Sequence, residues 1–199
     1  MMTDTNDKKV EEITKPEDAK ISFYENTYDI KGSDTTIMEF LKATKNGKWK
    51  KDVERIRAVT DEIKQKKAKE STLGCVTISG TFPPNKRKDE HLIKHSRFLC
   101  IDIDKLAPDE IKRIKNVLEN DQYVYAVWTS VRGGGLVVLI RIDGSRHLEL
   151  YCMVEKIYKE RYGITIDSSC KNLSRLRYVS SDPNIFINVN AKMFQEHLA

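Results

Sequence analysis

The segment from Arg97 to Ile103 constrains the fold of this chain more than any other part of the sequence. It is a near-continuous apolar run with the acidic residue Asp102 near its end, and Asp104 follows directly. Strands that are covered by other elements on both faces have this pattern, whereas half-exposed strands alternate between apolar and polar residues. The sequence therefore predicts a core strand here, with an acidic pair at its end.

Patterns upstream of this strand predict a helical and strand extension. Thr36-Ile-Met-Glu39 fits a capping box and opens a short helix. A basic amphipathic helix is predicted from Trp49 to Lys69, with a buried stripe at helical spacing formed by Val53, Ile56, Val59 and Ile63. Residues 73–82 alternate between apolar and polar side chains, which predicts a strand that ends before Pro83-Pro84.

From Arg97 onward the predicted order is strand, helix, strand, strand, helix, strand. The helices begin near Pro108 and cover 146–161, and the later strands cover 123–130, 136–142 and 164–166. Short strands are also predicted at 176–179 and 185–189. This order is the split β-α-β pattern of ferredoxin-like and RRM-like folds, so the fold class is α/β (α+β). Such folds serve many functions, and side chains must distinguish them.

The length of 199 residues favours one compact domain. We expect residues 1–18 to be a disordered arm and 19–199 a single primase-like domain, with an N-terminal α/β part (19–90) and an RRM-like part (91–199). No apolar run approaches the roughly 20 residues that cross a bilayer, and the N-terminus resembles no secretory signal. These features predict a cytoplasmic protein without a membrane partner.

The acidic pair suggests a metal site. Side chains two residues apart on a strand share a face, so Asp102 and Asp104 would lie side by side and repel each other. A divalent cation, Mg²⁺ or Mn²⁺, would reduce that repulsion. Asp167, after a predicted short strand, is a candidate third ligand. The alternatives are acids that end a strand in solvent and, for Asp167, a helix-capping or turn residue.

Basic residues suggest contacts with phosphate groups. Arg175 and Arg177 alternate on one predicted strand face, although salt bridges to surface acids are the ordinary alternative. The turn Ser130-Val-Arg-Gly-Gly-Gly135 offers backbone N–H groups but lacks the end of a P-loop. Between residues 42 and 69 the chain has eleven Lys or Arg against four Asp or Glu, which fits either a nucleic-acid backbone or a solvated helix face.

Four segments in order resemble one known family. They are Gly74-Cys-Val-Thr-Ile-Ser-Gly-Thr-Phe82, His95-Ser-Arg-Phe-Leu-Cys-Ile-Asp-Ile-Asp-Lys-Leu106, Ser130-Val-Arg-Gly-Gly-Gly-Leu136 and Ser174-Arg-Leu-Arg-Tyr-Val-Ser-Ser-Asp-Pro-Asn184. Together they resemble the VirE N-terminal domain family of Bacteroides-type bacteria and their mobile elements, which looks related to the archaeo-eukaryotic primase superfamily. The specificity comes from the four motifs occurring in this order.

The resemblance implies roles for particular residues. Asp102, Asp104 and Asp167 would be the catalytic, metal-binding acids. The family's hairpin usually ends in a polar residue, commonly His, that contacts the phosphates of the nucleotide, but Val137 stands at that position here. Arg141 shares its predicted strand face and could substitute. The expected phosphate-binding residues are Ser130, Arg132, Arg141, Arg175 and Arg177.

The implied activity is that of a metal-dependent DNA primase or nucleotidyltransferase in the replication or mobilisation of a mobile genetic element. Two ions about 4 Å apart would bind the triphosphate and polarise the attacking hydroxyl. The expected partners are single-stranded DNA or a primer–template, NTP or dNTP, and a helicase-like domain or protein. Template contacts are expected at Lys48, Lys64, Lys66 and Lys67. The alternatives are a catalytically inactive domain that binds nucleic acid or a partner, motivated by Val137, and a structural module with surface acids.

Overall fold

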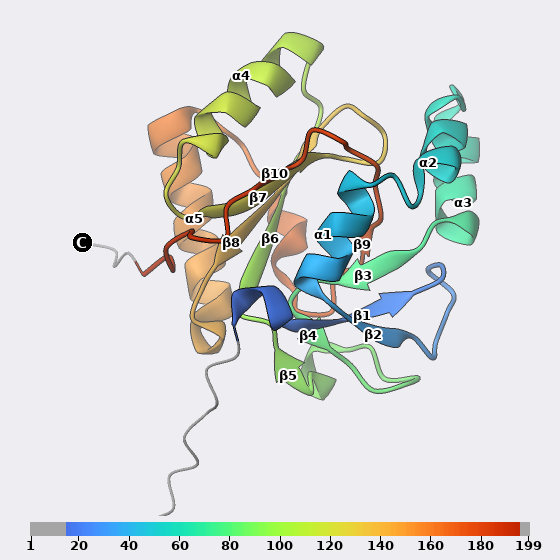
Figure 1. The fold of residues 1–199 in the computed structure, drawn as a ribbon, viewed down its shortest axis with the longest axis horizontal. Helices are drawn as coiled ribbons and strands as arrows, with labels where there is room; N and C mark the ends of the chain where they lie inside the picture. Colours follow the sequence, from blue (N-terminus) through green and yellow to red (C-terminus); the bar gives the residue numbers. More distant parts are fainter. Residues whose placement is uncertain (1–14, 196–199) are drawn as a thin grey trace, which may run out of the picture.

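The protein has an α+β fold, as predicted, and a computed structural model describes residues 15–195 (Figure 1). The first sheet has the strand order β2-β1-β3-β9 and the second the order β10-β7-β8-β6. The first sheet contains β1 (Lys20–Tyr24), β2 (Ser33–Thr36), β3 (Cys75–Thr77) and β9 (Arg177–Tyr178). The second contains β6 (Phe98–Ile103), β7 (Val124–Thr129), β8 (Leu136–Arg141) and β10 (Phe186–Ile187). A small pair is formed by β4 (Gly80–Thr81) and β5 (Lys94–His95).

Helices cover both faces of the second sheet. On one face lie α4 (Pro108–Glu119) and α5 (His147–Tyr162), and on the other lies α1 (Ile37–Lys45), with α2 (Lys50–Arg57) beyond it (Figure 1). The apolar run of β6 therefore has a buried side chain on each face. Ile101 and Ile103 pack with α4 and α5, whereas Cys100 packs with α1. The predicted core strand is confirmed.

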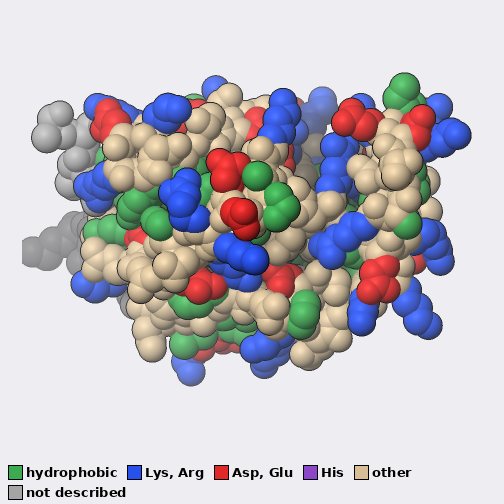
Figure 2. Space-filling model, turned by 90° about the horizontal axis from the view of Figure 1, so that it is seen from above, with side chains coloured by type: hydrophobic (Ala, Val, Ile, Leu, Met, Phe, Trp, Pro, Cys, Tyr) green, Lys and Arg blue, Asp and Glu red, His purple; other side chains and the backbone are tan. Residues whose placement is uncertain are grey.

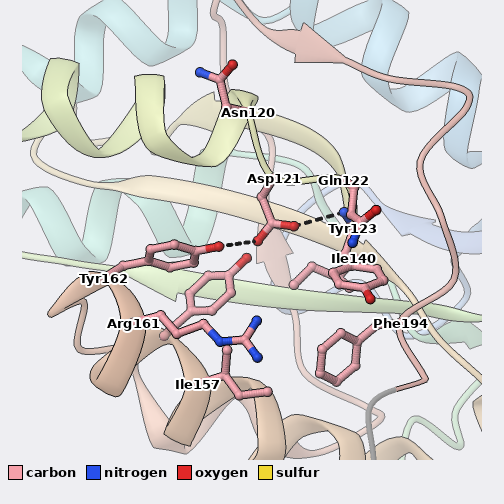
Figure 3. A pocket seen from close by; sticks show the side chains of 10 residues that line it. Asn120, Asp121, Gln122, Tyr123, Ile140, Ile157, Arg161, Tyr162 and Phe194 are labelled. Atoms are coloured by element: carbon pink, nitrogen blue, oxygen red, sulfur yellow. Dashed lines mark hydrogen bonds between the residues drawn. The ribbon is translucent and has the colours of Figure 1, made fainter.

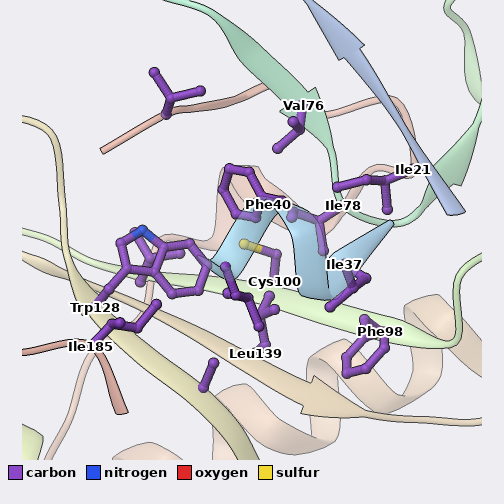
Figure 4. Close-up of a cluster of buried hydrophobic side chains, with 14 of the residues drawn as sticks. Ile21, Ile37, Phe40, Val76, Ile78, Phe98, Cys100, Trp128, Leu139 and Ile185 are labelled. Atoms are coloured by element: carbon purple, nitrogen blue, oxygen red, sulfur yellow. The ribbon is translucent and has the colours of Figure 1, made fainter. Parts of the chain in front are cut away.

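Aromatic side chains link the two sheets through the cluster around α1 (Figure 4). Trp128 on β7 is fully buried, and its ring meets that of Phe40 on α1 edge to face, with centroids 5.8 Å apart. Phe98 and Tyr125 form a similar pair at 4.8 Å. Val76 from the first sheet belongs to the same cluster, so the two sheets share one continuous apolar core.

The split pattern is confirmed for β6, α4, β7, β8 and α5, with β8 lying antiparallel between β6 and β7. The last predicted strand, 164–166, is wrong. That segment runs beside β6 but makes a single backbone hydrogen bond to it, from Asp167 N to Asp102 O (2.9 Å). The Asp167 side chain accepts a hydrogen bond from Ser169 N, which turns the chain into a 3₁₀ helix (Ser168–Lys171) and ends the pairing. β10 extends the sheet at its other edge instead.

The predicted helix from Trp49 to Lys69 is also wrong, because the chain forms α2 and then α3 (Glu62–Thr72). Asp61 caps the second helix by accepting a hydrogen bond from Lys64 N (2.8 Å). Ile63, predicted to be buried, is 70% exposed. By contrast, the capping box of Thr36 and Glu39 at the start of α1 is confirmed.

The remaining predictions at the ends of elements are partly confirmed. The predicted strand 73–82 is divided into β3 and β4, and the strands predicted at 176–179 and 185–189 are shorter than expected. Residues 1–14 of the predicted arm lie outside the described residues. Pro16–Asp18, near the end of the arm, forms a 3₁₀ turn. Within residues 15–195 no helix is long and apolar enough to cross a membrane.

Candidate metal and phosphate site

Asp102 lies near the end of β6 on the face that carries the α1 cluster. It is paired across the sheet with Val137 of β8, and its side chain is only 13% exposed. Asp167 reaches the same place through its backbone bond to Asp102 O, and the hydroxyl of Tyr151 on α5 donates to Asp167 O (2.7 Å). Two segments that are distant in the sequence therefore meet at the end of β6.

Three possible metal ligands converge there. Single ligand atoms of Asp102, Asp167 and Cys170 all lie within 4.8 Å of one another. The Cys170 thiol is 3.4 Å from Asp167 Oδ2 and 3.9 Å from Asp102 Oδ2. Asp104, which was predicted to join the two other acids, is not part of this group. Cys170 was not predicted, although its place three residues after Asp167 is a spacing that a single turn brings together.

Arg177 lies inside the site and not on its surface. Its guanidinium donates to Asp102 Oδ2 and lies 3.6 Å from Cys170 Sγ, and its side chain is 11% exposed. Burial alone would lower the pKa of Arg177, but the neighbouring Cys100 and Asp102 keep it well above its ordinary value. The structure therefore places this predicted phosphate ligand in a buried ion pair.

Asp104 is exposed to solvent, yet the protein around it changes the pKa of its carboxyl group. Partial desolvation raises the pKa of Asp104, as do the negative charges of Asp102 and Asp167, against the effect of Arg177 and Arg132. Desolvation is the larger cause, because burial disfavours the charged form of a carboxyl group. The negative charges of Asp102 and Asp167 act in the same direction.

Lys69, on α3, is a further residue that the sequence did not single out. Burial and the charge of Arg132 lower the pKa of Lys69, whereas Asp102 and Asp104 raise it. Its ammonium lies over the ring of Tyr178 at 4.4 Å from the centroid. Lys69 and Arg132 therefore provide positive charge within electrostatic reach of the acidic pair. Only the basic composition of the segment could have pointed to Lys69.

The glycine-rich turn after β7 packs directly against Asp104. A Cβ atom added to Gly135 would lie 2.5 Å from Ile103 O and 3.1 Å from Asp104 Oδ1, so glycine is required for this close approach. On the other side, Arg57 of α2 donates to Val131 O (3.0 Å) and to Ser130 O (3.2 Å). The turn that contains Ser130 and Arg132 is therefore fixed between α2 and the acids.

Two other predicted phosphate ligands, Arg141 and Arg175, bind backbone carbonyl groups elsewhere in the chain. Arg141 is paired with Phe98, four residues before Asp102 on β6, and donates to Ala191 O (2.7 Å), so the structure does not bring it to the acids. Arg175 is exposed and donates to Ser169 O and to Asn172 Oδ1. Arg175 therefore braces the turn that carries Asp167.

The predicted template-binding lysines lie around α2 and α3, where Figure 2 shows Lys and Arg side chains interspersed with acids on the right of the view. Lys64, Lys66 and Lys67 are exposed on α3, and Lys66 is 4.0 Å from Glu70. Lys48 precedes α2 and lies over the Trp49 ring at 5.4 Å. Because Lys69 belongs to the same helix, α3 connects this basic surface to the acidic site.

The comparisons with known proteins give one match. The family described as "BT4734-like, N-terminal domain" matches residues 67–186. Comparisons with curated proteins and with solved structures found no match. The matched range is more than half of the chain, and it contains both Asp102 and Asp167 together with Lys69, Arg132 and Arg177. The chain therefore belongs to the BT4734-like N-terminal domain family.

Proposed function

We propose that the chain is a primase- or polymerase-type nucleotidyltransferase-like domain that acts on DNA with a divalent cation bound by Asp102 and Asp167. The observation that carries this proposal is the convergence of these two carboxylates at the end of a buried strand, with Asp104 directly after that strand. The resemblance of four ordered motifs to the VirE N-terminal domain family, and through it to the primase superfamily, supports the same assignment. The setting, replication or mobilisation of a mobile element, rests on that resemblance.

The acids fit a divalent cation in two respects. Asp102 Oδ1 is buried and has no hydrogen-bond partner among the described residues, so it has a lone pair to offer. Asp104, which directly follows β6, adds a second negative charge near Asp102. Carboxylate oxygens suit Mg²⁺ or Mn²⁺, whereas the thiol of Cys170 is a soft ligand that suits neither. A bound cation would supply charge to phosphate oxygens and polarise the attacking hydroxyl.

The surrounding residues would position the substrate. Arg132 and Lys69 flank the acids and would contact the phosphates of an NTP or dNTP. Arg177 already neutralises Asp102 and would share that carboxylate with a cation. Single-stranded DNA or a primer–template would follow the lysines of α3, and a helicase-like domain or protein would be a partner in the same process.

A primer synthesis assay tests this proposal. Wild-type protein is expected to incorporate nucleotides on single-stranded DNA when Mg²⁺ or Mn²⁺ is present. Asp102→Asn and Asp104→Asn should each lower the rate at least tenfold, because each removes a negative charge that the cation needs. Asp109→Asn, at an exposed acid in the first turn of α4, is the matched control and should retain the wild-type rate. Absence of both incorporation and Mn²⁺ binding in the wild type would reject the proposal.

A second candidate function is a catalytically inactive domain that binds nucleic acid or a partner. Val137, which is paired directly with Asp102, is 2% exposed and has no group that could contact a phosphate. The ion pair with Arg177 also gives Asp102 a structural role that requires no cation. Together these two features favour retention of the fold without catalysis.

Charge reversal on α3 tests nucleic-acid binding. Lys64→Glu, Lys66→Glu and Lys67→Glu combined should weaken single-stranded DNA binding at least tenfold and reduce its salt dependence. With fewer lysines in contact with phosphates, binding releases fewer counterions from the DNA. Fluorescence anisotropy at several salt concentrations measures both quantities. The matched control reverses three exposed lysines elsewhere: Lys112, Lys156 and Lys192. If the control weakens binding equally, or if the wild type does not bind, the assignment of α3 fails.

A further inference from the structure

A second possible ligand site lies on the other face of the second sheet. A pocket of about 360 Å³ is formed by the turn after α4, the start of β7, the C-terminal part of α5, and Phe194 (Figure 3). Ile140 of β8 lines this pocket and belongs to the cluster of α4 and α5, whereas Val137, opposite Asp102, belongs to the α1 cluster. The pocket is therefore separate from the acidic site.

Aromatic rings form two walls of the pocket. Tyr123 and Phe194 meet edge to face, with centroids 5.3 Å apart and an interplanar angle of 89°. Tyr158 and Tyr162 form a second such pair at 5.6 Å and 73°. Ring faces and edges of this kind bind flat, conjugated ligands by stacking and edge contacts. The shape of the walls thus favours a planar ligand.

Asp121 provides a negative charge beside these rings. Its Oδ1 accepts a hydrogen bond from Tyr123 N (2.9 Å) and its Oδ2 accepts one from the Tyr162 hydroxyl (3.1 Å), as Figure 3 shows. Each carboxylate oxygen has two lone pairs, so Asp121 can accept further hydrogen bonds from a ligand while these two keep it oriented. It is a fixed acceptor for N–H groups and repels anions.

The Tyr158 hydroxyl completes the polar part of the site. Tyr158 is 3% exposed, and its hydroxyl has no hydrogen-bond partner among the described residues. Tyr158 lines the pocket, and Asp121 is among the groups that raise its pKa, after burial itself. Buried hydroxyls nearly always have a partner, and one that lacks a partner destabilises the fold. A ligand atom in the pocket would supply the missing partner.

We propose that this pocket binds a purine nucleobase, with guanine as the best complement, in a nucleoside or nucleotide. The Watson–Crick edge of guanine presents two adjacent N–H donors, which suit a carboxylate such as Asp121. Its neighbouring carbonyl oxygen would accept the hydrogen bond that the Tyr158 hydroxyl lacks. An apolar ligand would leave the Tyr158 hydroxyl without a partner and would not use the remaining lone pairs of Asp121. Adenine offers one donor on that edge and fits less well.

The size of the pocket agrees with this ligand. Small-molecule sites usually measure about 300–1,000 Å³, and 360 Å³ is near the lower limit. A flat bicyclic base fits a site of this size, with the sugar directed toward solvent. The pocket would therefore recognise the base, in contrast to the acidic site.

Guanosine binding to the full chain, measured by calorimetry in the presence of EDTA, tests the proposal. Guanosine has no phosphate and EDTA removes divalent cations, so the acidic site should not contribute. Tyr158→Phe is expected to weaken guanosine binding about three- to tenfold, the value of one ordinary hydrogen bond. The same substitution should leave thermal stability unchanged or raise it, because it removes a buried hydroxyl without a partner. A purely structural role for Tyr158 would not give this combination.

Further variants and ligands make the outcome decisive. Asp121→Asn should weaken guanosine binding at least tenfold, and adenosine should bind the wild type more weakly than guanosine. Asp104→Asn, at an exposed acid of the acidic site, should bind guanosine as the wild type does. The proposal is overturned if the wild type does not bind guanosine, if Tyr158→Phe and Asp121→Asn both retain wild-type affinity, or if Asp104→Asn abolishes binding, which would place guanosine at the acidic site.

Discussion

Replacing Arg177 with methionine is expected to lower the free energy of unfolding by about 3–5 kcal/mol. The side chains of Arg177 and Asp102 are 11% and 13% exposed, so the substitution leaves a buried carboxylate without its countercharge. Asp102 Oδ1 already has no hydrogen-bond partner among the described residues, and the other oxygen would lose its main one. Chemical denaturation at neutral pH, with the midpoint and slope compared, measures the loss.

Two controls separate the charge from the packing. The double variant Asp102→Asn/Arg177→Met should be much more stable than Arg177→Met alone, because it has no buried charge to compensate. Mn²⁺ should stabilise Arg177→Met more than the wild type, because without the guanidinium the cation would be the main countercharge of Asp102. Wild-type stability of Arg177→Met would contradict the buried pair, and equal stabilisation of both proteins by Mn²⁺ would show that Arg177 does not affect cation binding at Asp102.

A second large effect is expected from a pair of neutral histidines. His95 Nε2 lies 3.0 Å from His147 Nδ1, at the start of α5. Arg97 N donates to His95 Nδ1 (2.8 Å), so His95 carries its proton on Nε2 and donates to His147. Burial, followed by the charges of His147 and Arg97, lowers the pKa of His95 to about 4. Burial also lowers the pKa of His147.

The stability of the protein should therefore fall by about 2–3 kcal/mol as the pH is lowered from about 6.5 to about 4. In the unfolded chain the histidines bind protons near pH 6.5, whereas burial in the folded state keeps His95 neutral until near pH 4. Hydrogen-bonded carboxylates affect the stability at lower pH. The Ser145 N–H, for example, holds the pKa of Asp143 below its ordinary value, so that contribution is lost only below about pH 4.

Denaturation curves recorded at several pH values test this effect. His95→Gln should flatten the dependence between pH 6.5 and 4 whatever its stability at neutral pH. His91→Gln, at a histidine whose side chain is 39% exposed, is the control and should retain the wild-type slope. A slope that His95→Gln leaves unchanged would show that other groups take up the protons.

The parts of the fold that local pattern determines could be predicted from the sequence. The apolar run of β6 and the capping box of α1 depend on neighbouring residues alone, and both are confirmed. Strand alternation also predicts a common face for Asp102 and Asp104, but β6 ends at Ile103, one residue before Asp104. The division between α2 and α3 also has a local signal, the cap residue Asp61, although the helical spacing of apolar residues continues across it.

The arrangement of the site could not be predicted, because it depends on pairing between distant segments. Arg177 turns inward because β9 joins the first sheet beside β3, where Arg177 is paired with Val76. Cys170 enters the site because a 3₁₀ turn replaces the expected strand after residue 166. Neither event leaves a pattern in the immediate sequence, which predicts only salt bridges to surface acids for Arg177.

The ion pair between Asp102 and Arg177 joins strands that belong to different sheets and are 75 residues apart in the chain. Closing so long a loop costs entropy that local contacts do not repay, so the pair should form late in folding, after β9 has docked beside β3. A fragment that begins at residue 91 would contain all three acids and Arg177 but would lack β3, the strand that orients this arginine. The amino-terminal segment thus positions the arginine that neutralises Asp102, although the acids themselves lie in the later part of the chain.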